Sequence, residues 1–266
     1  MNIRLDKYLA DTGFGTRNEV RALVRSGVVT VNGERCKDSS MKVNTDSDSI
    51  SVGRQQLSYS EYEYYMLHKP AGIITASRDK KEKTVLDYIK SKKRRDLFPV
   101  GRLDRDTEGL LLITNDGELG HRLLSPDRHV EKCYTAIVEG VGPRDIVEIF
   151  ERGIDIGDDK NTKPAKLGRF SDMESFQKSY NDDIIIDRYN ALLENRDDAS
   201  SELSIYEIKI TEGRYHEIKR MFEAVGCSVV YLKRYSMGSL VLDKSLAPGE
   251  YRELTDEEIS CLKSKF

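Results

Sequence analysis

The chain lacks the cysteine pairs that zinc sites and thiol-redox centres use. It has four cysteines in 266 residues. They are widely scattered, at Cys36, Cys133, Cys227 and Cys261. None of them forms a C-x-x-C pair. His129 and Cys133 are four residues apart, but two isolated ligands do not make a metal site. We therefore expect free, reduced thiols and no bound metal.

Long apolar runs and nucleotide-binding glycine loops are also missing. No stretch reaches the roughly 18 apolar residues of a membrane-spanning helix, and the first seven residues lack the apolar run of a signal peptide. The chain contains neither a Walker-type loop nor G-x-G-x-x-G. We expect a cytoplasmic protein with no nucleotide cofactor and no membrane partner.

Charge is unevenly distributed along the chain. The net charge of −3 argues against nucleic-acid binding at first sight, but residues 171–202 contain nine acidic and three basic side chains. The remainder is therefore mildly positive and can present a basic face to phosphates. Residues 180–201 have no clear apolar period, and we interpret the acidic stretch at about 172–202 as an insertion.

Residues 1–53 have the pattern of a small unit with two helices and a hairpin. Three apolar side chains share the face of the first helix: Leu5, Tyr8 and Leu9. The capping box T-x-x-E at 16–19 predicts a second helix, which ends near Gly27. The sequence V-T-V-N-G at 29–33 predicts a strand and a tight hairpin turn.

Basic side chains follow the polar side of these helices. They are Arg4, Lys7, Arg17, Arg21 and Arg25. The last three are spaced by four and stack along one helical face. R-L-D-K-Y-L, the following basic helix and V-x-V-N-G together resemble the S4-like RNA-binding module. The resemblance implies that these five residues grip RNA, and it indicates binding rather than chemistry.

The most informative stretch covers residues 101–117. The charged segment G-R-L-D-R-D-T-E-G leads into L-L-L-I at 110–113, which predicts a buried strand before the N-D-G turn signal at 115–117. This pattern resembles the catalytic motif of RsuA-type ribosomal RNA pseudouridine synthases. The resemblance makes Asp104 the catalytic residue and Arg102 a substrate-binding residue.

Two further motifs resemble the same family. K-P-A-G at 69–72 resembles a structural turn without chemistry, between a predicted strand at 64–69 and a second one at 73–75. K-C-Y at 132–134 resembles the motif whose tyrosine stacks on the target base, which assigns that role to Tyr134. Such stacking contributes on the order of 1–3 kcal/mol.

The end of the chain resembles the family as well. The spacing at 217–222 predicts a helix that leaves Lys219 free to point away from the core. In the third family motif a basic residue pairs with the catalytic Asp. The match falls on Lys219, with Arg220 as the alternative, and either cation would keep Asp104 ionised. Leu232 matches an apolar residue that packs near the base.

The resemblance implies conversion of uridine to pseudouridine. The N1–C1′ bond breaks, the base turns over, and C5 joins C1′. The reaction has no redox step, so neither a cofactor nor a metal is expected. The base must first leave its stack. Asp104 either attacks C1′ or removes a ribose proton to give a glycal, and the sequence leaves both routes open.

The stretch R-Y-H-E-I-K-R-M at 214–221 resembles the branch that modifies small-subunit (16S) ribosomal RNA. We expect a monomer that acts on 16S RNA or on a small-subunit assembly intermediate. Glu217 stands where Gln is usual, and an acidic insertion beside the cleft would reject wrong RNAs. The alternatives are a synthase for large-subunit (23S) RNA and a catalytically idle RNA-binding or ribosome-assembly protein.

The predicted fold class is α+β. A helix-helix-hairpin RNA-binding domain occupies 1–53, and 54–63 is a linker. A larger domain with a mixed, mainly antiparallel β-sheet and flanking helices occupies 64–266. The densest basic run, at 90–95, fits a phosphate contact and a solvated helix end equally well.

Overall fold

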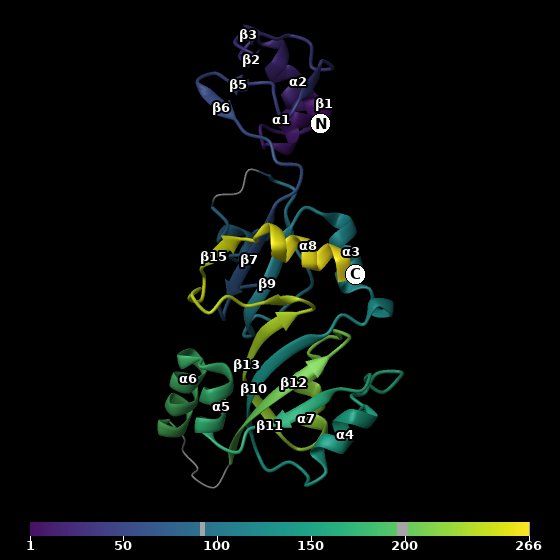
Figure 1. The fold of residues 1–266 in the computed structure, drawn as a ribbon, viewed down its shortest axis with the longest axis vertical. Coiled ribbons are helices and arrows are strands. Elements are labelled where there is room, and N and C mark those ends of the chain that lie inside the picture. The colour runs from purple at the N-terminus through teal and green to yellow at the C-terminus, as the bar shows by residue number, and fades with distance from the viewer. Residues whose placement is uncertain (91–93, 196–201, 266) are drawn as a thin grey trace.

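The computed structural model describes residues 1–90, 94–195 and 202–265. A small N-terminal domain and a larger sheet domain follow one another along the long axis of the molecule (Figure 1). Within these ranges no helix has both the length and the apolar character needed to cross a membrane.

The N-terminal domain packs two helices against short strands. Its elements are β1 (Asn2–Arg4), α1 (Leu5–Asp11), α2 (Arg17–Arg25), β2 (Val29–Val31), β3 (Glu34–Arg35), β4 (Lys42–Asn44), β5 (Ile50–Val52) and β6 (Gln55–Leu57). The predicted capping box is confirmed, because Thr16 and Glu19 each accept a backbone hydrogen bond from the other. Asn32 and Gly33 both have positive φ, as a two-residue hairpin turn requires. Strand β6 pairs with β5, so the segment predicted as a linker begins as part of this domain.

The larger domain is built on one twisted sheet. Its strands are β7 (Tyr64–Lys69), β8 (Phe98–Pro99), β9 (Glu108–Thr114), β10 (Lys132–Glu139), β11 (Lys166–Arg169), β12 (Leu203–Ile210), β13 (Ser228–Met237), β14 (Leu240–Val241) and β15 (Tyr251–Glu253). The main order is β11-β12-β10-β13-β9-β7-β15, with β14 beside β13 and β8 beside β9. Strands β9 and β13 pair in parallel, whereas β10 pairs antiparallel with both β12 and β13. The predicted α+β class is confirmed.

Helices cover both faces of the sheet (Figure 1). They are α3 (Gly117–Leu124), α4 (Ile146–Arg152), α5 (Met173–Tyr180), α6 (Asp183–Glu194), α7 (Glu217–Ala224) and α8 (Asp256–Lys265). The α4 and α7 helices share one core cluster with Tyr134, Ala136 and Val138 of β10. Ile137, which points to the other face, packs with α5 and α6. The alternation of one strand therefore separates two cores.

Three local predictions differ from the structure. The second strand predicted at 73–75 is reduced to a single bridge between Ile74 and Thr84. The turn signal at 115–117 begins helix α3, because the Asp116 side chain accepts the Leu119 N–H as an N-cap. The acidic stretch forms α5 and α6, which bury Phe176 and Ile185, and only its 196–201 part lies outside the described residues.

The two domains meet at a buried arginine. Arg94 donates hydrogen bonds to Asp11 of the N-terminal domain, to Tyr59 of the connecting segment and to Asp96. Its side chain is only 6% exposed. Arg94 thus fits neither reading of the basic run at 90–95, since it joins protein to protein; residues 91–93 of that run lie outside the described residues.

The parallel seam between β9 and β13 requires a glycine. Gly109 pairs with Arg234 and has a φ of +104°. A Cβ atom at this position would lie 2.3 Å from the Arg234 carbonyl oxygen and 2.7 Å from its nitrogen. Both contacts are backbone, so the clash cannot be relieved by rotating a side chain.

We predict that Gly109→Ala lowers the free energy of unfolding by about 3 kcal/mol or more, through positive-φ strain and the backbone clash. Urea unfolding of the variant measures the loss. Gly117→Ala is the matched control, because its added Cβ meets no atom within 4 Å. Equal stability of both variants would show that the seam tolerates a side chain.

Candidate active site

A cavity of about 570 Å³ opens where the loop before β9 faces β10, β13 and the start of α7. Its walls contain Arg102, Asp104, Tyr134, Lys219 and Leu232, all of them predicted site residues from distant parts of the chain. Their roles stay predictions, but the fold brings the five side chains to one place.

Asp104 lies in the loop between β8 and β9, and its side chain is 26% exposed. Two side chains fix this loop from below. The Thr75 hydroxyl donates to the Leu103 carbonyl at 2.7 Å and accepts the Leu103 N–H at 3.2 Å. The Lys69 ammonium donates to the carbonyls of Arg105 and Thr107 at 3.1 and 2.9 Å. The carboxylate is therefore held at a defined place in a partly exposed site.

Two basic side chains from the start of α7 approach Asp104. The Lys219 ammonium lies 3.5 Å from one carboxylate oxygen, and the His216 Nε2 atom lies 3.6 Å from the other. Lys219 makes its hydrogen bonds to Asp106, at 2.6 and 2.8 Å. Burial acts to raise the pKa of Asp106, but the Lys219 hydrogen bond and charge hold it below its usual value. Lys219 therefore serves two carboxylates, and the sequence pointed to one.

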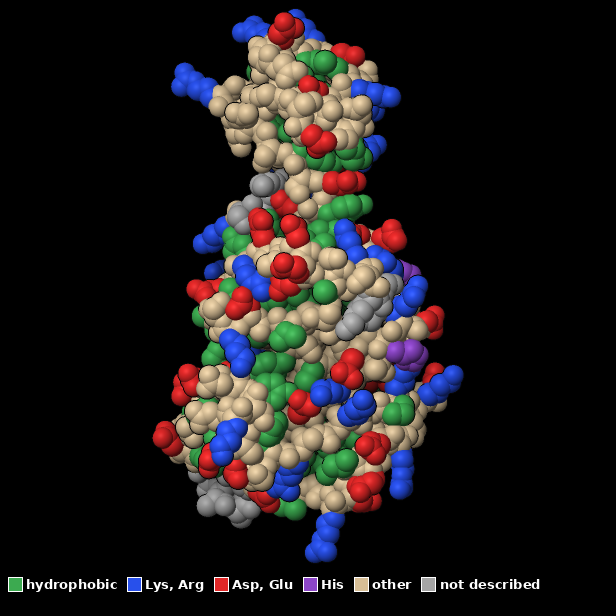
Figure 2. Space-filling model, viewed as in Figure 1, with side chains coloured by type: hydrophobic (Ala, Val, Ile, Leu, Met, Phe, Trp, Pro, Cys, Tyr) green, Lys and Arg blue, Asp and Glu red, His purple; other side chains and the backbone are tan. Residues whose placement is uncertain are grey.

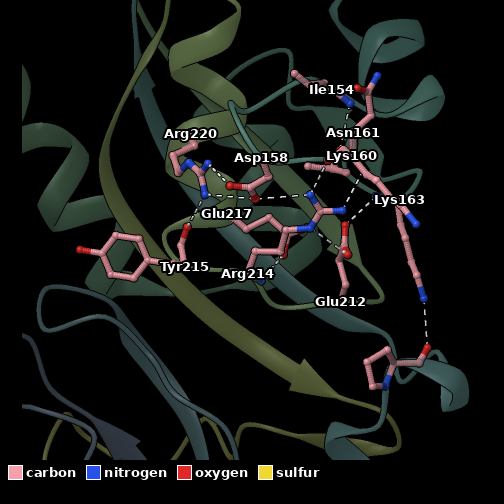
Figure 3. Close-up of polar contacts among 12 residues, drawn as sticks. Ile154, Asp158, Lys160, Asn161, Lys163, Glu212, Arg214, Tyr215, Glu217 and Arg220 are labelled. Atoms are coloured by element: carbon pink, nitrogen blue, oxygen red, sulfur yellow. Dashed lines mark hydrogen bonds and ion pairs between the residues drawn. The ribbon is translucent and has the colours of Figure 1, made fainter.

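Arg220, the alternative partner of Asp104, points elsewhere. Its guanidinium bonds to the Asp158 carboxylate at 2.6 Å and to the Tyr215 carbonyl at 3.2 Å (Figure 3). Successive helical residues point about 100° apart, so Lys219 and Arg220 cannot face the same carboxylate. Of the two candidates for the pairing, Lys219 is therefore the one that lies against Asp104, and the alternative, Arg220, does not.

Tyr134 and Leu232 come from neighbouring strands. Antiparallel pairing of β10 and β13 places Ala136 opposite Leu232 and Tyr134 opposite Arg234. Both cavity-lining side chains are buried, at 7% and 5% exposure. They give the cavity an aromatic and an aliphatic surface, which suits the flat face of a base.

Several site residues were not singled out from the sequence. Lys69 sits in a motif to which we assigned no chemistry, yet it holds the Asp104 loop. Lys132 lines the cavity, and burial, followed by the charge of Arg234, lowers its pKa to about 8. Tyr215 also lines the cavity, is 71% exposed and stacks on the His216 ring with 3.9 Å between centroids. The signal in the sequence for Tyr215 was a tyrosine directly before the basic residues at the start of a predicted helix.

The described part of the acidic insertion, helices α5 and α6, does not lie beside this cavity. Tyr134 faces the cavity, whereas its neighbour Cys133 faces the other side of the sheet and contacts the Tyr180 hydroxyl of α5 at 3.7 Å. Helices α5 and α6 therefore cover the back of the sheet, because adjacent strand residues point to opposite faces. The expectation of an acidic filter beside the cleft is corrected accordingly.

The five predicted RNA-binding residues are all exposed on the N-terminal domain: Arg4, Lys7, Arg17, Arg21 and Arg25. Figure 2 shows Lys and Arg side chains projecting from this domain. Arg4 and Arg21 are oriented by the buried Asp6 carboxylate, at 2.9 and 3.4 Å. The hydrogen bond from Arg4 lowers the pKa of Asp6 and outweighs its burial.

Comparison with known proteins identifies the family of this chain. A family model described as RNA pseudouridylate synthase matches residues 63–224, and an S4 domain model matches residues 3–50. An uncharacterized RNA pseudouridine synthase of Bacillus subtilis, YtzG, is 42% identical over 98% of both chains. Ribosomal large subunit pseudouridine synthase B of the same organism is 36% identical, over 98% of this chain and 96% of its own.

Two other relatives cover nearly the whole chain. Ribosomal small subunit pseudouridine synthase A of Escherichia coli K12 is 34% identical over 97% of this chain and 99% of its own. A crystal structure of a pseudouridylate synthase, also 34% identical, superposes with a TM-score of 0.60 and covers 98% of this chain and 99% of that one. The chain therefore belongs to the RNA pseudouridine synthase family and carries an S4 domain at its N-terminus.

Proposed function

We propose that this protein converts one uridine of small-subunit ribosomal RNA to pseudouridine, with Asp104 as the essential catalytic residue. The observation that carries the proposal is a carboxylate within 4 Å of two basic groups, in a cavity lined by an aromatic ring. The R-Y-H-E-I-K-R-M stretch favours the small subunit, and the relatives named small subunit pseudouridine synthase A support that choice.

The arrangement suits the chemistry. A flipped uracil fits between Tyr134 and Leu232, with its ribose toward Asp104. The carboxylate then attacks C1′ or removes a ribose proton, and the N1–C1′ bond breaks. Lys219 and His216, at 3.5 and 3.6 Å, flank the two oxygens of the Asp104 carboxylate and hold it in place. The base turns over within the cavity and C5 bonds to C1′. On the first route this releases the Asp104 carboxylate from C1′, and on the second the carboxylic acid returns its proton to the ribose. C5 then loses its proton and N1 gains one, which completes the isomerisation.

Large-subunit RNA is the second candidate substrate. The B. subtilis relative named large subunit pseudouridine synthase B is 36% identical, a level similar to that of the small-subunit relatives. The cavity gives no reason to prefer either RNA, since it holds one base. Selection between the two RNAs therefore depends on contacts outside the cavity. Mapping of pseudouridine on both ribosomal RNAs distinguishes the two candidates.

We predict that Asp104→Asn abolishes isomerisation and leaves RNA affinity nearly unchanged, because the amide can neither attack C1′ nor accept a ribose proton. Carbodiimide labelling with primer extension on ribosomal RNA measures the product. Asp106→Asn is the control: it removes the other Lys219 partner, whose side chain is 72% exposed, and should retain at least about a tenth of the activity.

A primer-extension stop that appears with the wild type and not with Asp104→Asn marks the modified uridine, and its position identifies which ribosomal RNA is the substrate. A stop in small-subunit RNA supports the proposal, and a stop in large-subunit RNA moves the enzyme to the second candidate. If naked RNA gives no stop, assembly intermediates are tested next. A wild type that modifies neither would be an idle RNA-binding protein, and turnover by Asp104→Asn would remove that residue from its role.

We further predict that the triple variant Arg17→Gln, Arg21→Gln, Arg25→Gln flattens the salt dependence of RNA binding. Each lost phosphate contact reduces the slope of log affinity against log salt by about 0.7–0.9. The variant should lose about two units of slope. A second triple variant, Arg144→Gln, Arg152→Gln, Lys166→Gln, removes the same charge from exposed sites at the far end of the sheet domain. Identical slopes for the two variants would refute a role for the α2 face.

A further inference from the structure

A buried carboxyl group lies in the wall of the active-site cavity without a charge partner of its own. Glu217 is the first residue of α7 and is 4% exposed. Its Oε2 atom accepts the Arg214 N–H at 2.8 Å. Its buried Oε1 atom finds no donor in the described part of the chain. Burial of an ionised carboxylate in this position would be unfavourable in free energy. The protonated form, with the proton on Oε1, is therefore favoured.

Glu212 supplies an acceptor for that proton. The two side chains lie next to one another (Figure 3), so a proton on Glu217 can form a hydrogen bond with the Glu212 carboxylate. Glu212 accepts more hydrogen bonds than Glu217 and is therefore the member of the pair that stays ionised more readily. It accepts the Lys163 N–H at 2.6 Å and the Arg214 Nε–H at 3.2 Å. The Arg214 guanidinium is itself fixed by the carbonyls of Lys160 and Asn161, at 2.6 and 2.7 Å.

One proton therefore serves two carboxyl groups, since adjacent carboxylates resist joint ionisation. Burial, together with the charge of Glu212, raises the pKa of Glu217 to about 7. Glu212 is also partly buried, but its hydrogen bonds lower its pKa. Two lysines also lie near the pair. Lys132 of β10, beyond which lies Arg234 of β13, donates to the carbonyls of Val130 and Glu212. The Lys163 ammonium donates to the Pro126 carbonyl.

The pair spans the loop that carries the active-site cations. Glu212 follows β12, Glu217 opens α7, and residues 213–216 between them line the cavity. His216 has a left-handed backbone, with φ of +49°, and Lys219 lies half a turn into the helix. Any separation of the two glutamates moves both groups relative to Asp104.

We propose that Glu217 is a positioning residue for the isomerisation, and that a proton shared with Glu212 holds His216 and Lys219 against Asp104. The inference rests on the proposed function and adds a pH response to it. Loss of the proton places two negative charges side by side with Arg214 as their common cation, and the loop opens. A glutamine at this position would donate the same hydrogen bond at every pH.

The test compares the wild type with Glu217→Gln between pH 6 and 8.5, on the RNA that the wild type modifies. The ratio of the two kcat values cancels the pH effects of the substrate and of other side chains. We expect the kcat of the wild type divided by that of Glu217→Gln to fall about tenfold between pH 6 and 8. One pH unit above its pKa, a group is only about a tenth protonated. Glu223→Gln, an exposed change on the same helix, should follow the wild type. A constant ratio would overturn the positioning role.

A second measurement does not depend on activity. The folded protein binds the Glu217 proton more tightly than the unfolded chain, so the wild type is stabilised most below about pH 4.5 and loses that contribution as the pH rises to about 7. Relative to Glu217→Gln, its folding equilibrium constant should fall roughly tenfold or more across this window and stay level above it. A flat difference would overturn the shared proton. Absence of turnover in every variant would instead refute the proposed function, and the stability comparison would still decide the shared proton.

Discussion

The active site depends on one buried ammonium group. Lys69 ends strand β7, is fully buried, and donates hydrogen bonds to the carbonyls of Pro70, Arg105 and Thr107. Burial lowers its pKa to about 8, against the opposing charges of Glu108, Asp106 and Asp104. The loop around Asp104 belongs to no helix or strand, so this cation, together with the Thr75 hydroxyl that binds Leu103, holds a polar loop in place. A neutral side chain of similar length would remove the donor of the Pro70 and Thr107 carbonyls and leave the Arg105 carbonyl with the Gly72 N–H alone.

The two faces of the sheet have different roles: one lines the cavity, and the other packs against α5 and α6. Residues of β10 and β13 that point to one face line the cavity, and their neighbours point into the core under α5 and α6. Glu108 links the two sides: its buried carboxylate accepts a hydrogen bond from the Tyr231 hydroxyl at 2.8 Å and pairs with Arg188 of α6 at 3.4 Å. The acidic helices thus brace the strand that follows the Asp104 loop. Their negative charge stays on the face away from the cavity.

Most of the fold could be predicted because local signals agree with it. The α2 capping box, the Asn32–Gly33 turn and the apolar run at 110–113 are each satisfied within a few residues of chain. The clustering of Asp104, Tyr134, Lys219 and Leu232 needed the family resemblance, since spacing alone does not bring distant segments together. The dual use of Lys219 and the burial of Glu217 could not be predicted, because both depend on three-dimensional neighbours. The insertion was misplaced for the same reason: composition gives its charge but not the face of the sheet it covers.

The buried Arg94 junction has a consequence for how an RNA is selected. An arm that is bonded to the body through Asp11 and Tyr59 keeps its basic helix at a fixed span from Asp104. Under the proposed function, an RNA bound by that helix can place in the cavity only a nucleotide that lies at the matching distance along its folded surface. The proposed target would then be selected by distance and shape as well as by the surrounding sequence.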